Sequence, residues 1–557
     1  MVTQPAAWPT GKDRVSDDSV YGLAVAVSIA TIVLTAFFSR YVQAVIAWFQ
    51  AGRLLRRQFP SPPVDNIIAG HAVAMQSPKN HRWLSDTYRQ LGPLFYVRLA
   101  HNHVVFVSDP ALLPIMFDRA LYPPNANILD RPVEEFLVQM DAMTSGSGHS
   151  NMLTDKTGSD LWRLVRKGVA PAFNPQNIRQ GFTYVLEAVD QLMAALKERG
   201  SEKAVDLDDA AQRVSMEVIG KVGFGKCFGA MESLDHPAEG DAFKVIATGF
   251  EEVAKRLSNP VRKYMLWDQG VRKGNEAFKA FHQIIRNLLR EVQARGPPAE
   301  DDPTIAGHLL RLRDQKGQPL SDDRLHAEFS AMFIGGTDTS GHTIANTLYF
   351  ISQHPEAERR IEAELDSLGF LVTSTRKNPK RMEYADLSKL TYLSGAIKES
   401  MRMMAVVGTG VGRVVNEQMQ LGKHTIPKGT ILWAPIQAIQ SSPTLWDKPD
   451  SFVPERWLEE DAEFWKGPAN GSASSGDKSA EVVRGRRYLP FGDGVRSCVG
   501  QSLAKMNYTA TLALLLSHFS FRLADRMGGA EGVAAAEVSR ITVAPKDGMW
   551  MHAVPRG

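Results

Sequence analysis

Hydrophobic residues form one long uncharged run near the start of the chain, from Val20 to Phe38. A helix of roughly 20 apolar residues crosses a bilayer, so the run predicts a single transmembrane helix. Asp17 and Asp18 precede the run, and basic residues follow it: Arg40, Arg53, Arg56 and Arg57. Positive charges on the C-terminal side predict that the rest of the chain lies in the cytosol. A cleaved signal peptide is the competing interpretation, but the run is long and the segment before it is not clearly basic.

The same pattern divides the chain into parts. Residues 1–19 form a short N-terminal tail, 20–38 the anchor, 39–63 a basic and proline-rich linker, and 64–557 a folded body. The prolines of the Phe-Pro-Ser-Pro-Pro segment at 59–63 predict a stiff, extended connection between anchor and body.

Within the body, helical periodicity dominates. Amphipathic stretches cover 176–197 and 273–295, and an apolar helical pattern covers 325–351. Aromatic and β-branched residues predict strands in three places. They are a pair over 94–107 turning near His101 and Asn102, a small sheet over 414–433, and a closing hairpin over 539–555 turning at 546–548. The pattern therefore predicts a mainly α-helical fold with small β-sheets.

Composition excludes several classes of protein. The formal net charge of +3 over 557 residues gives no global nucleic-acid footprint. The two cysteines, Cys227 and Cys498, exclude a disulfide scaffold and a four-cysteine zinc site. The glycine-rich segment around Cys498 lacks the strand–helix–strand context of a dinucleotide-binding fingerprint.

Cys498 lies in a glycine-rich segment, residues 491–500, that reads Phe-Gly-Asp-Gly-Val-Arg-Ser-Cys-Val-Gly. A thiolate binds soft metals strongly, and glycines let the backbone approach a flat ligand closely. A buried structural cysteine in a turn is the alternative interpretation. However, the segment resembles the haem-thiolate loop of the cytochrome P450 family, Phe-x-x-Gly-x-Arg-x-Cys-x-Gly. Every fixed position matches: Phe491, Gly494, Arg496, Cys498 and Gly500.

This resemblance implies a cytochrome P450 fold over the catalytic domain at 64–557, with haem b as the cofactor and Cys498 as the ligand of its iron. The remaining motifs occur in family order, and the resemblance covers residues from about 59 to 556.

The helical segment at 325–351 contains Gly335-Gly336-Thr337-Asp338-Thr339. Adjacent glycines inside a helix cost about 1 kcal/mol each relative to alanine, and such local conflicts often mark functional sites. Thr339 can donate its hydroxyl hydrogen to the carbonyl four residues earlier or release it. The resemblance implies that Thr339 stabilises bound dioxygen and that Asp338 supports proton delivery. A kinked helix with a threonine cap is the alternative.

Two further motifs match the family. Glu399 and Arg402 stand three apart, and Arg456 follows in Phe-Val-Pro-Glu-Arg-Trp. The resemblance implies that these three side chains form a structural ion-pair cluster, in which arginine forks satisfy a buried carboxylate. An exposed helix pair is the alternative.

Trp162 and Arg166 stand four apart, on one helix face. The resemblance implies that this pair, together with Arg413 and Arg496, binds the haem carboxylates. For each single arginine the alternative is a solvated surface charge. The chain departs from the family pattern at 405–410, where prolines are usual, and at Asn507, where a glutamate is common.

The resemblance implies a membrane-anchored monooxygenase. Family members that act without dioxygen often lack the acid–threonine pair, which is present here as Asp338 and Thr339. The enzyme would insert one atom of dioxygen into a small lipophilic substrate, with electrons from NADPH through a flavin reductase, at the endoplasmic reticulum membrane. The arginines at 484, 486 and 487 predict a cationic docking face for that reductase. The alternatives are an oxygen-independent haem-thiolate isomerase or dehydratase and a non-catalytic haem-binding membrane protein. Apolar residues at 127–154, 205–257 and 405–412, with the tip of the C-terminal hairpin, are expected to line the pocket.

Overall fold

The computed structural model describes residues 17–117, 128–130, 143, 150–232, 234, 242–458 and 486–557. The chain divides into two compact units, residues 1–58 and residues 59–557. The second unit, called the body below, contains every motif discussed above.

The first unit contains the helix α1 (Asp17–Gln58), which includes residues 20–38 and continues through residues 39–58 of the predicted linker. The non-helical connection begins at Phe59, where the prolines start. Among the parts of the chain described, no helix has both the length and the apolar character needed to cross a bilayer. Within residues 20–38, the described side chains are those of Ala26, Ile29, Phe37 and Phe38.

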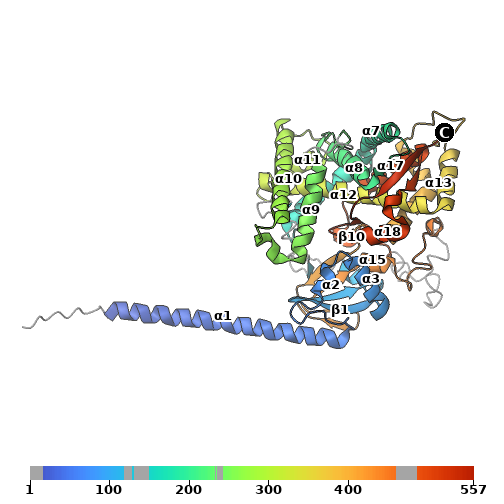
Figure 1. Ribbon diagram of the computed structural model, residues 1–557. Helices are drawn as coiled ribbons and strands as arrows, with labels where there is room; N and C mark the ends of the chain where they lie inside the picture. The colour runs from blue at the N-terminus through green and yellow to red at the C-terminus, as the bar shows by residue number, and fades with distance from the viewer. Residues whose placement is uncertain are drawn as a thin grey trace, which may run out of the picture. The chain divides into compact units, whose positions relative to one another are not determined.

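Helices make up most of the body (Figure 1). The shorter ones are α2 (Ala72–Gln76), α3 (Asn80–Leu91), α4 (Leu113–Phe117), α6 (Asp160–Val169), α11 (Ile305–Arg311), α15 (Ile436–Gln440) and α18 (Gly529–Ala536). The longer ones are α7 (Pro175–Arg199), α8 (Leu207–Phe224), α9 (Ala242–Ser258), α10 (Gln269–Ala294), α12 (Asp322–Gln353), α13 (Pro355–Ser367), α14 (Thr391–Met403) and α17 (Gln501–His518). The three helical stretches predicted from periodicity are confirmed as α7, α10 and α12.

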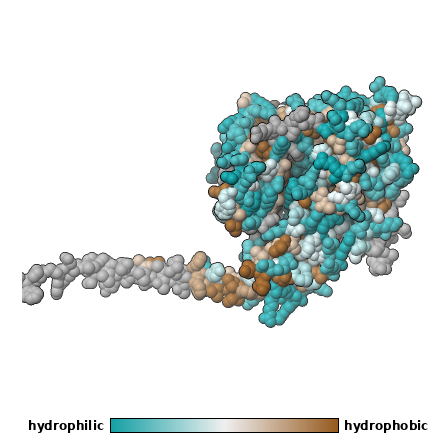
Figure 2. All heavy atoms as spheres, viewed as in Figure 1, coloured by the Kyte–Doolittle hydropathy of each residue, from teal (hydrophilic) through white to brown (hydrophobic). Residues whose placement is uncertain are grey.

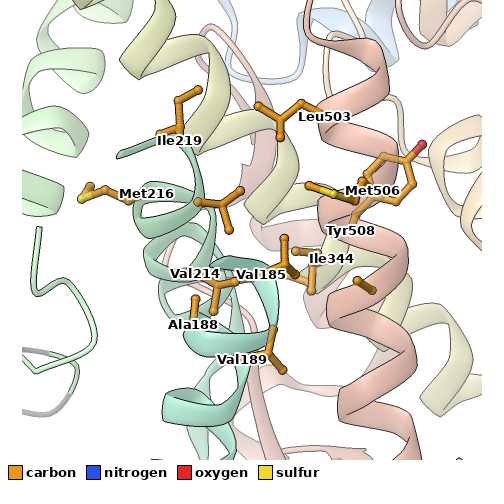
Figure 3. Close-up of a cluster of buried hydrophobic side chains, with 14 of the residues drawn as sticks. Val185, Ala188, Val189, Val214, Met216, Ile219, Ile344, Leu503, Met506 and Tyr508 are labelled. Atoms are coloured by element: carbon orange, nitrogen blue, oxygen red, sulfur yellow. The ribbon is translucent and has the colours of Figure 1, made fainter. Parts of the chain in front are cut away.

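Helix α12 is the central element of the body. Its first turn is capped by Ser321, whose hydroxyl accepts a hydrogen bond from the amide of Arg324 at 3.2 Å. It packs against α8, α14 and α17, and nearly all of its side chains are buried. Figure 3 shows apolar side chains of α7, α8, α12 and α17 lying close together. Labelled there are Val185, Ala188, Val189, Val214, Met216, Ile219, Ile344, Leu503, Met506 and Tyr508.

A five-stranded sheet lies beside α2, α3 and α15 (Figure 1). Its order is β1 (Leu94–Leu99), β2 (Asn102–Val107), β8 (Ile431–Ala434), β5 (Val411–Val415) and β3 (Leu129–Asp130). The predicted pair over 94–107 is confirmed as the antiparallel ladder of β1 and β2, which closes at Leu99 and Asn102. The predicted sheet over 414–433 is confirmed too, with β6 (Met419–Leu421) and β7 (His424–Ile426) as a separate hairpin.

The predicted C-terminal hairpin is wrong in its pairing. Strand β10 (Glu537–Ser539) pairs with β11 (Val543–Pro545), so the chain turns at 540–542. Strand β12 (Trp550–Pro555) pairs instead with β4 (Val205–Asp206) and β9 (Phe519–Leu523). The segment at 546–548 therefore connects two sheets. Alternation along a strand predicts which side chains share a face but not which strand lies alongside, and this explains the error.

Candidate active site

A cavity of about 1380 Å³ lies inside the body. Helices α6, α8, α9, α12 and α17, the segment around Cys498 and the turn between β10 and β11 contribute its lining. The predicted lining segments at 205–257 and 405–412 contribute residues to the lining. Of the predicted C-terminal tip at 546–548, Lys546 lines the cavity, and the actual turn at 540–542 lines it as well. Of the predicted segment at 127–154, residues 152–154 line the cavity, and most of the others lie outside the described residues.

Cys498 lies at one wall of this cavity. Its side chain is open to the cavity, while protein atoms surround it on the other sides. The amide of Cys498 donates to the carbonyl of Phe491 at 2.9 Å, which closes the loop between them. Gly494 has φ +68°, and a Cβ there would lie 2.3 Å from the carbonyl oxygen of Phe117. A side chain at position 494 would therefore push the cysteine loop away from Phe117.

The electrostatic surroundings of Cys498 act in opposite directions. Burial raises the pKa of the thiol, while the backbone N–H of Gly500 and the charge of Arg166 lower it, and the net shift is upward. Binding to a metal ion deprotonates a thiol outright, so a metal would overcome this shift. The donor set at Cys498 thus favours coordination over free nucleophilic chemistry.

Cationic and indole side chains line the cavity near Cys498. Arg166 on α6 donates to the carbonyl of Ser497 at 2.8 Å, which ties that helix to the cysteine loop. Arg496 donates to Thr157 Oγ1 and to the carbonyl of Met152, each at 2.9 Å. Its guanidinium carbon is 4.1 Å from the centroid of the Trp162 ring. The predicted partners Trp162, Arg166 and Arg496 therefore lie together.

Two observations show that these residues fit a flat, carboxylate-bearing group. The indole Nε1 of Trp162 is buried and has no hydrogen-bond partner, although it lines the cavity. A buried donor without a partner is costly, and a carboxylate would satisfy it. On the α12 side, a Cβ added at Gly335 would meet nothing within 4 Å, so the helix backbone leaves open space there. A haem would find a thiolate, cations and open space in this cavity.

Arg413 lies in a different environment. Among the described residues, those that line the cavity do not include Arg413 or Gly494. Arg413 is buried, donates to the carbonyl of Gly412 at 2.8 Å, and lies 5.8 Å from the centroid of the Phe117 ring. Its role at a haem carboxylate stays a prediction.

The predicted pair on α12 also lines the cavity. Thr339 Oγ1 donates to the carbonyl of Gly335 at 3.1 Å. Asp338 is buried, and its Oδ2 accepts a hydrogen bond from Thr542 at 2.5 Å. Burial alone would raise the pKa of Asp338, but the charge and hydrogen bond of His342, the Thr542 hydroxyl and Arg540 outweigh it and lower the pKa. Asp338 is therefore held as a carboxylate.

The two glycines before Asp338 and Thr339 have different structural roles. A Cβ at Gly336 would lie 2.6 Å from Ile219 Cγ1, so this glycine lets α8 pack against α12. Gly335 instead faces the open cavity.

The cluster at Glu399 is fully buried, as the Glu-x-x-Arg motif suggested. Arg402 donates from Nε and a terminal nitrogen to the two oxygens of Glu399, both at 2.9 Å. Arg456 Nε donates to Oε1 at 3.0 Å. Two further donors to the same carboxylate were not predicted, the Trp457 indole at 2.9 Å and the Val453 amide at 3.0 Å. The position of Trp457 directly after Arg456 was the available signal.

Asn507 is also placed by the structure. It lines the cavity, is buried, and its Nδ2 donates to Ser215 Oγ on α8 at 3.0 Å. The amide thus links α17 to α8.

The predicted cationic docking face is not formed as expected. Arg487 is buried, donates to the carbonyl of Leu445 at 2.9 Å and lies 4.7 Å from the centroid of the Trp446 ring. Arg486 pairs with Asp493 at 3.0 Å, and Arg484 lies outside the described residues. Single-sequence reasoning cannot separate buried arginines from exposed ones in a loop, and this explains the difference.

Comparison with known proteins agrees with this geometry. The family model described as Cytochrome P450 matches residues 60–529. The chain is 27% identical over 492 residues to a (+)-piperitol/(+)-sesamin synthase of Sesamum radiatum, covering 87% of this chain and 88% of that protein. It is 26% identical over 515 residues to a flavonoid 3'-monooxygenase of Arabidopsis thaliana, covering 89% and 92%. It is also 26% identical over 374 residues to a cyclooctat-9-en-7-ol 5-monooxygenase of Streptomyces melanosporofaciens, covering 67% and 73%. With its mainly helical body and with Cys498 facing a cavity that fits haem b, the chain belongs to the cytochrome P450 family of haem monooxygenases.

Proposed function

We propose that this protein is a membrane-anchored monooxygenase that inserts one atom of dioxygen into a small lipophilic substrate, using electrons from NADPH delivered by a flavin reductase. The observation that carries the proposal is the placement of Cys498 and of the Asp338–Thr339 pair on one cavity of about 1380 Å³.

The bound haem would supply the iron at which dioxygen is bound and reduced, and the thiolate ligand favours cleavage of the O–O bond. The residues of this chain do the rest. Cys498 provides the thiolate, and the N–H of Gly500 points to its sulfur. Trp162, Arg166 and Arg496 bind the carboxylates of the cofactor. Asp338 and Thr339, which also line the cavity, would hold and move protons there.

The substrate is proposed to be lipophilic because apolar side chains dominate the part of the cavity away from Cys498. Among them are Phe250, Ile305, Val406, Ile431 and Ile436. Such a lining binds by excluding water and gives little charge recognition.

The membrane location rests on two features. One is the apolar character of residues 20–38. The other is a set of exposed hydrophobic side chains in the body, in or next to the helices α2 and α9, which contact each other. They are Val64, Ile67, Ile68, Val73, Val261, Tyr264, Leu266 and Trp267. Figure 2 shows separate hydrophobic areas on an otherwise largely hydrophilic face of the body. Exposed apolar groups of this kind suit contact with a membrane surface.

The proposal is tested with full-length protein in microsomes, a flavin reductase and NADPH. A panel of sterols, fatty acids, terpenoids and carotenoids is screened for spectral binding and then for oxygenated products. The reduced carbon-monoxide complex should show the red-shifted absorption of thiolate-bound haem, and Cys498→Ala should abolish it. Products formed without NADPH and dioxygen would instead favour the isomerase alternative, against which the Asp338–Thr339 pair argues. Protease added to intact microsomes should digest the body, and protection would reverse the proposed topology.

A further inference from the structure

Three buried ionisable side chains form a chain of contacts beside the cavity. His342 lies one turn after Asp338 on α12, and its Nε2 is 3.1 Å from Asp338 Oδ1. Its Nδ1 is 2.6 Å from Oδ1 of Asp208 on α8. All three side chains are buried, and of the three Asp338 lines the cavity. His342 and Asp208 thus lie behind Asp338.

The close approach of α8 and α12 creates this arrangement. A Cβ at Gly341 would lie 2.3 Å from Gln212 Cγ and 2.7 Å from its Cα, so the absence of a side chain lets the two helices touch. Asp208 stands one turn before Gln212, which brings its carboxylate to the ring of His342. Gln212 Nε2 donates to the other oxygen of Asp208 at 2.9 Å and fixes its orientation.

Both ring nitrogens of His342 face carboxylate oxygens. A neutral imidazole has one donor and one acceptor, whereas an imidazolium has two donors. Burial alone would lower the pKa of His342, but the charges and hydrogen bonds of Asp208 and Asp338 raise it well above the usual value. The ring is therefore held as a cation between two carboxylates.

Other charged groups surround this chain. Near Asp208 on the α8 side lie Asp206 and Asp209, and burial together with the charges of Asp208 and Asp209 raises the pKa of Asp206 to about 7. From the turn between β10 and β11, Arg540 acts on Asp338. Asp206 and Asp209 thus place further acidic groups beside Asp208, and these favour retention of a proton on the ring of His342.

We propose that His342 and Asp208 are positioning residues that hold Asp338 in place and supply it with protons during the reaction, an inference that rests on the proposed function. In the transfer step the Nε2–H bond of His342 breaks and an O–H bond forms on Asp338. The imidazolium becomes neutral with its remaining proton on Nδ1 toward Asp208, and Asp338 becomes a carboxylic acid. When Asp338 passes this proton into the cavity, a proton from solvent restores the imidazolium.

The first test reads the charge of His342 without any turnover. Full-length haem-loaded protein is labelled with ¹³C at the histidine Cε1 positions, and the signal lost in His342→Gln is assigned to His342. We expect the signal of a cation from about pH 6 to about pH 8, where an ordinary histidine titrates. In Asp208→Asn the same signal should titrate within this range. A neutral ring at pH 7 in the unmodified protein would overturn the proposal.

The second test uses the panel compound that gives the most product. In His342→Gln and Asp208→Asn the rate of product formation should fall by about 10²-fold, the lower end of what a positioned proton donor contributes, with more hydrogen peroxide formed per NADPH. Asp208→Glu keeps the carboxylate and should recover most of the product. Equal losses in Asp208→Asn and Asp208→Glu, at equal haem content, would indicate a packing role and overturn the proposal.

The matched control is His326→Gln. His326 is a buried histidine of the same helix, and its Nε2 faces the backbone carbonyl of His282 at 3.4 Å rather than a carboxylate. Its replacement should leave the ratio of product to peroxide unchanged, and an equal loss of product there would also count against the proposal. If no panel compound is turned over by the unmodified protein, the proposed function fails, whereas the charge of His342 is still decided by the first test.

Discussion

At the scale of single residues, buried charges in this protein are fixed by several partners at once. Glu399 has no exposed surface, and donors from Arg402, Arg456, Val453 and Trp457 reach its two oxygens. Removing one member of such a cluster leaves the others buried without a partner.

Glu399→Gln should therefore destabilise the protein by roughly 3–5 kcal/mol, because the new amide group presents a donor to the arginines. Thermal unfolding and haem content per protein measure the effect. Glu455→Gln is the matched control, since Glu455 is partly exposed and pairs with Arg360; there we expect a loss of about 0–1 kcal/mol. Comparable losses in both variants would mean that burial of Glu399 is not the cause.

The chain of Asp338 and His342 predicts a pH dependence of stability. The pKa of His342 is raised in the folded state, so its contribution is complete below its unfolded value of about 6.5 and is lost as the pH rises through the folded value. The pKa of Asp338 is lowered, so its contribution is complete above about 3.9 and is lost as the pH falls through the folded value.

The difference in stability between the unmodified protein and His342→Gln should thus be largest between about pH 4 and about pH 6.5 and shrink above it, at about 1.4 kcal/mol for each unit of pKa difference. Thermal unfolding across this range measures it. Burial lowers the pKa of His326, so in His326→Gln the trend with pH should have the opposite sign. A difference for His342→Gln that grows above pH 6.5 would contradict the assigned charge.

At the scale of elements, α12 combines a packing surface and a cavity surface in two neighbouring residues. A Cβ at Gly336 would collide with Ile219, whereas one at Gly335 would meet nothing within 4 Å. Identical substitutions one residue apart should therefore act through different mechanisms.

Gly336→Ala should destabilise the body by about 1–3 kcal/mol, because α8 must move away from α12. Gly335→Ala should stabilise the helix by up to about 1 kcal/mol through propensity, yet place a methyl group in the cavity and weaken haem binding. Unfolding of the cofactor-free proteins separates these effects from haem titration. The reverse pattern would mean that the two faces of α12 are exchanged.

At the scale of the whole molecule, the chain divides after residue 58 into two units, so the proposed anchor and the catalytic body are separate. The helix α1 has its own internal contacts, and residues 59–557 contain the cavity and the cysteine loop.

Deletion of residues 1–38 should therefore release the protein from carbonate-washed membranes while haem content is retained, with a change in body stability below about 1 kcal/mol. Deletion of residues 2–16 alone leaves the apolar run and should leave membrane retention unchanged. Sedimentation and the carbon-monoxide difference spectrum provide the two measurements. Retention after the longer deletion would shift the membrane contact to the exposed apolar side chains of the body.

Features whose evidence lies within one short segment could be predicted from the sequence. Helical periodicity identified α7 and α10, because the apolar residues of an amphipathic helix recur three and four positions apart. The long apolar helical pattern at 325–351 identified α12. The cysteine loop could also be identified from the sequence, since all of its motif residues lie within one short segment. Trp162 and Arg166 also lie on one helix and were found together.

The tertiary structure alone decided the contacts between distant segments. Strand β12 pairs with β9 rather than β11. The sequence does not predict this pairing, because the backbone hydrogen bonds between strands do not depend on particular side chains. The contact of Asp208 with His342 depends on how closely α8 and α12 pack. Gly341 permits this close packing, but a glycine in the sequence does not by itself predict which helix will pack against it. Arg487 is likewise buried against the ring of Trp446, which is distant from it in the sequence. Local patterns specify elements and ligand loops, whereas charges and strands acquire their partners only when the chain folds.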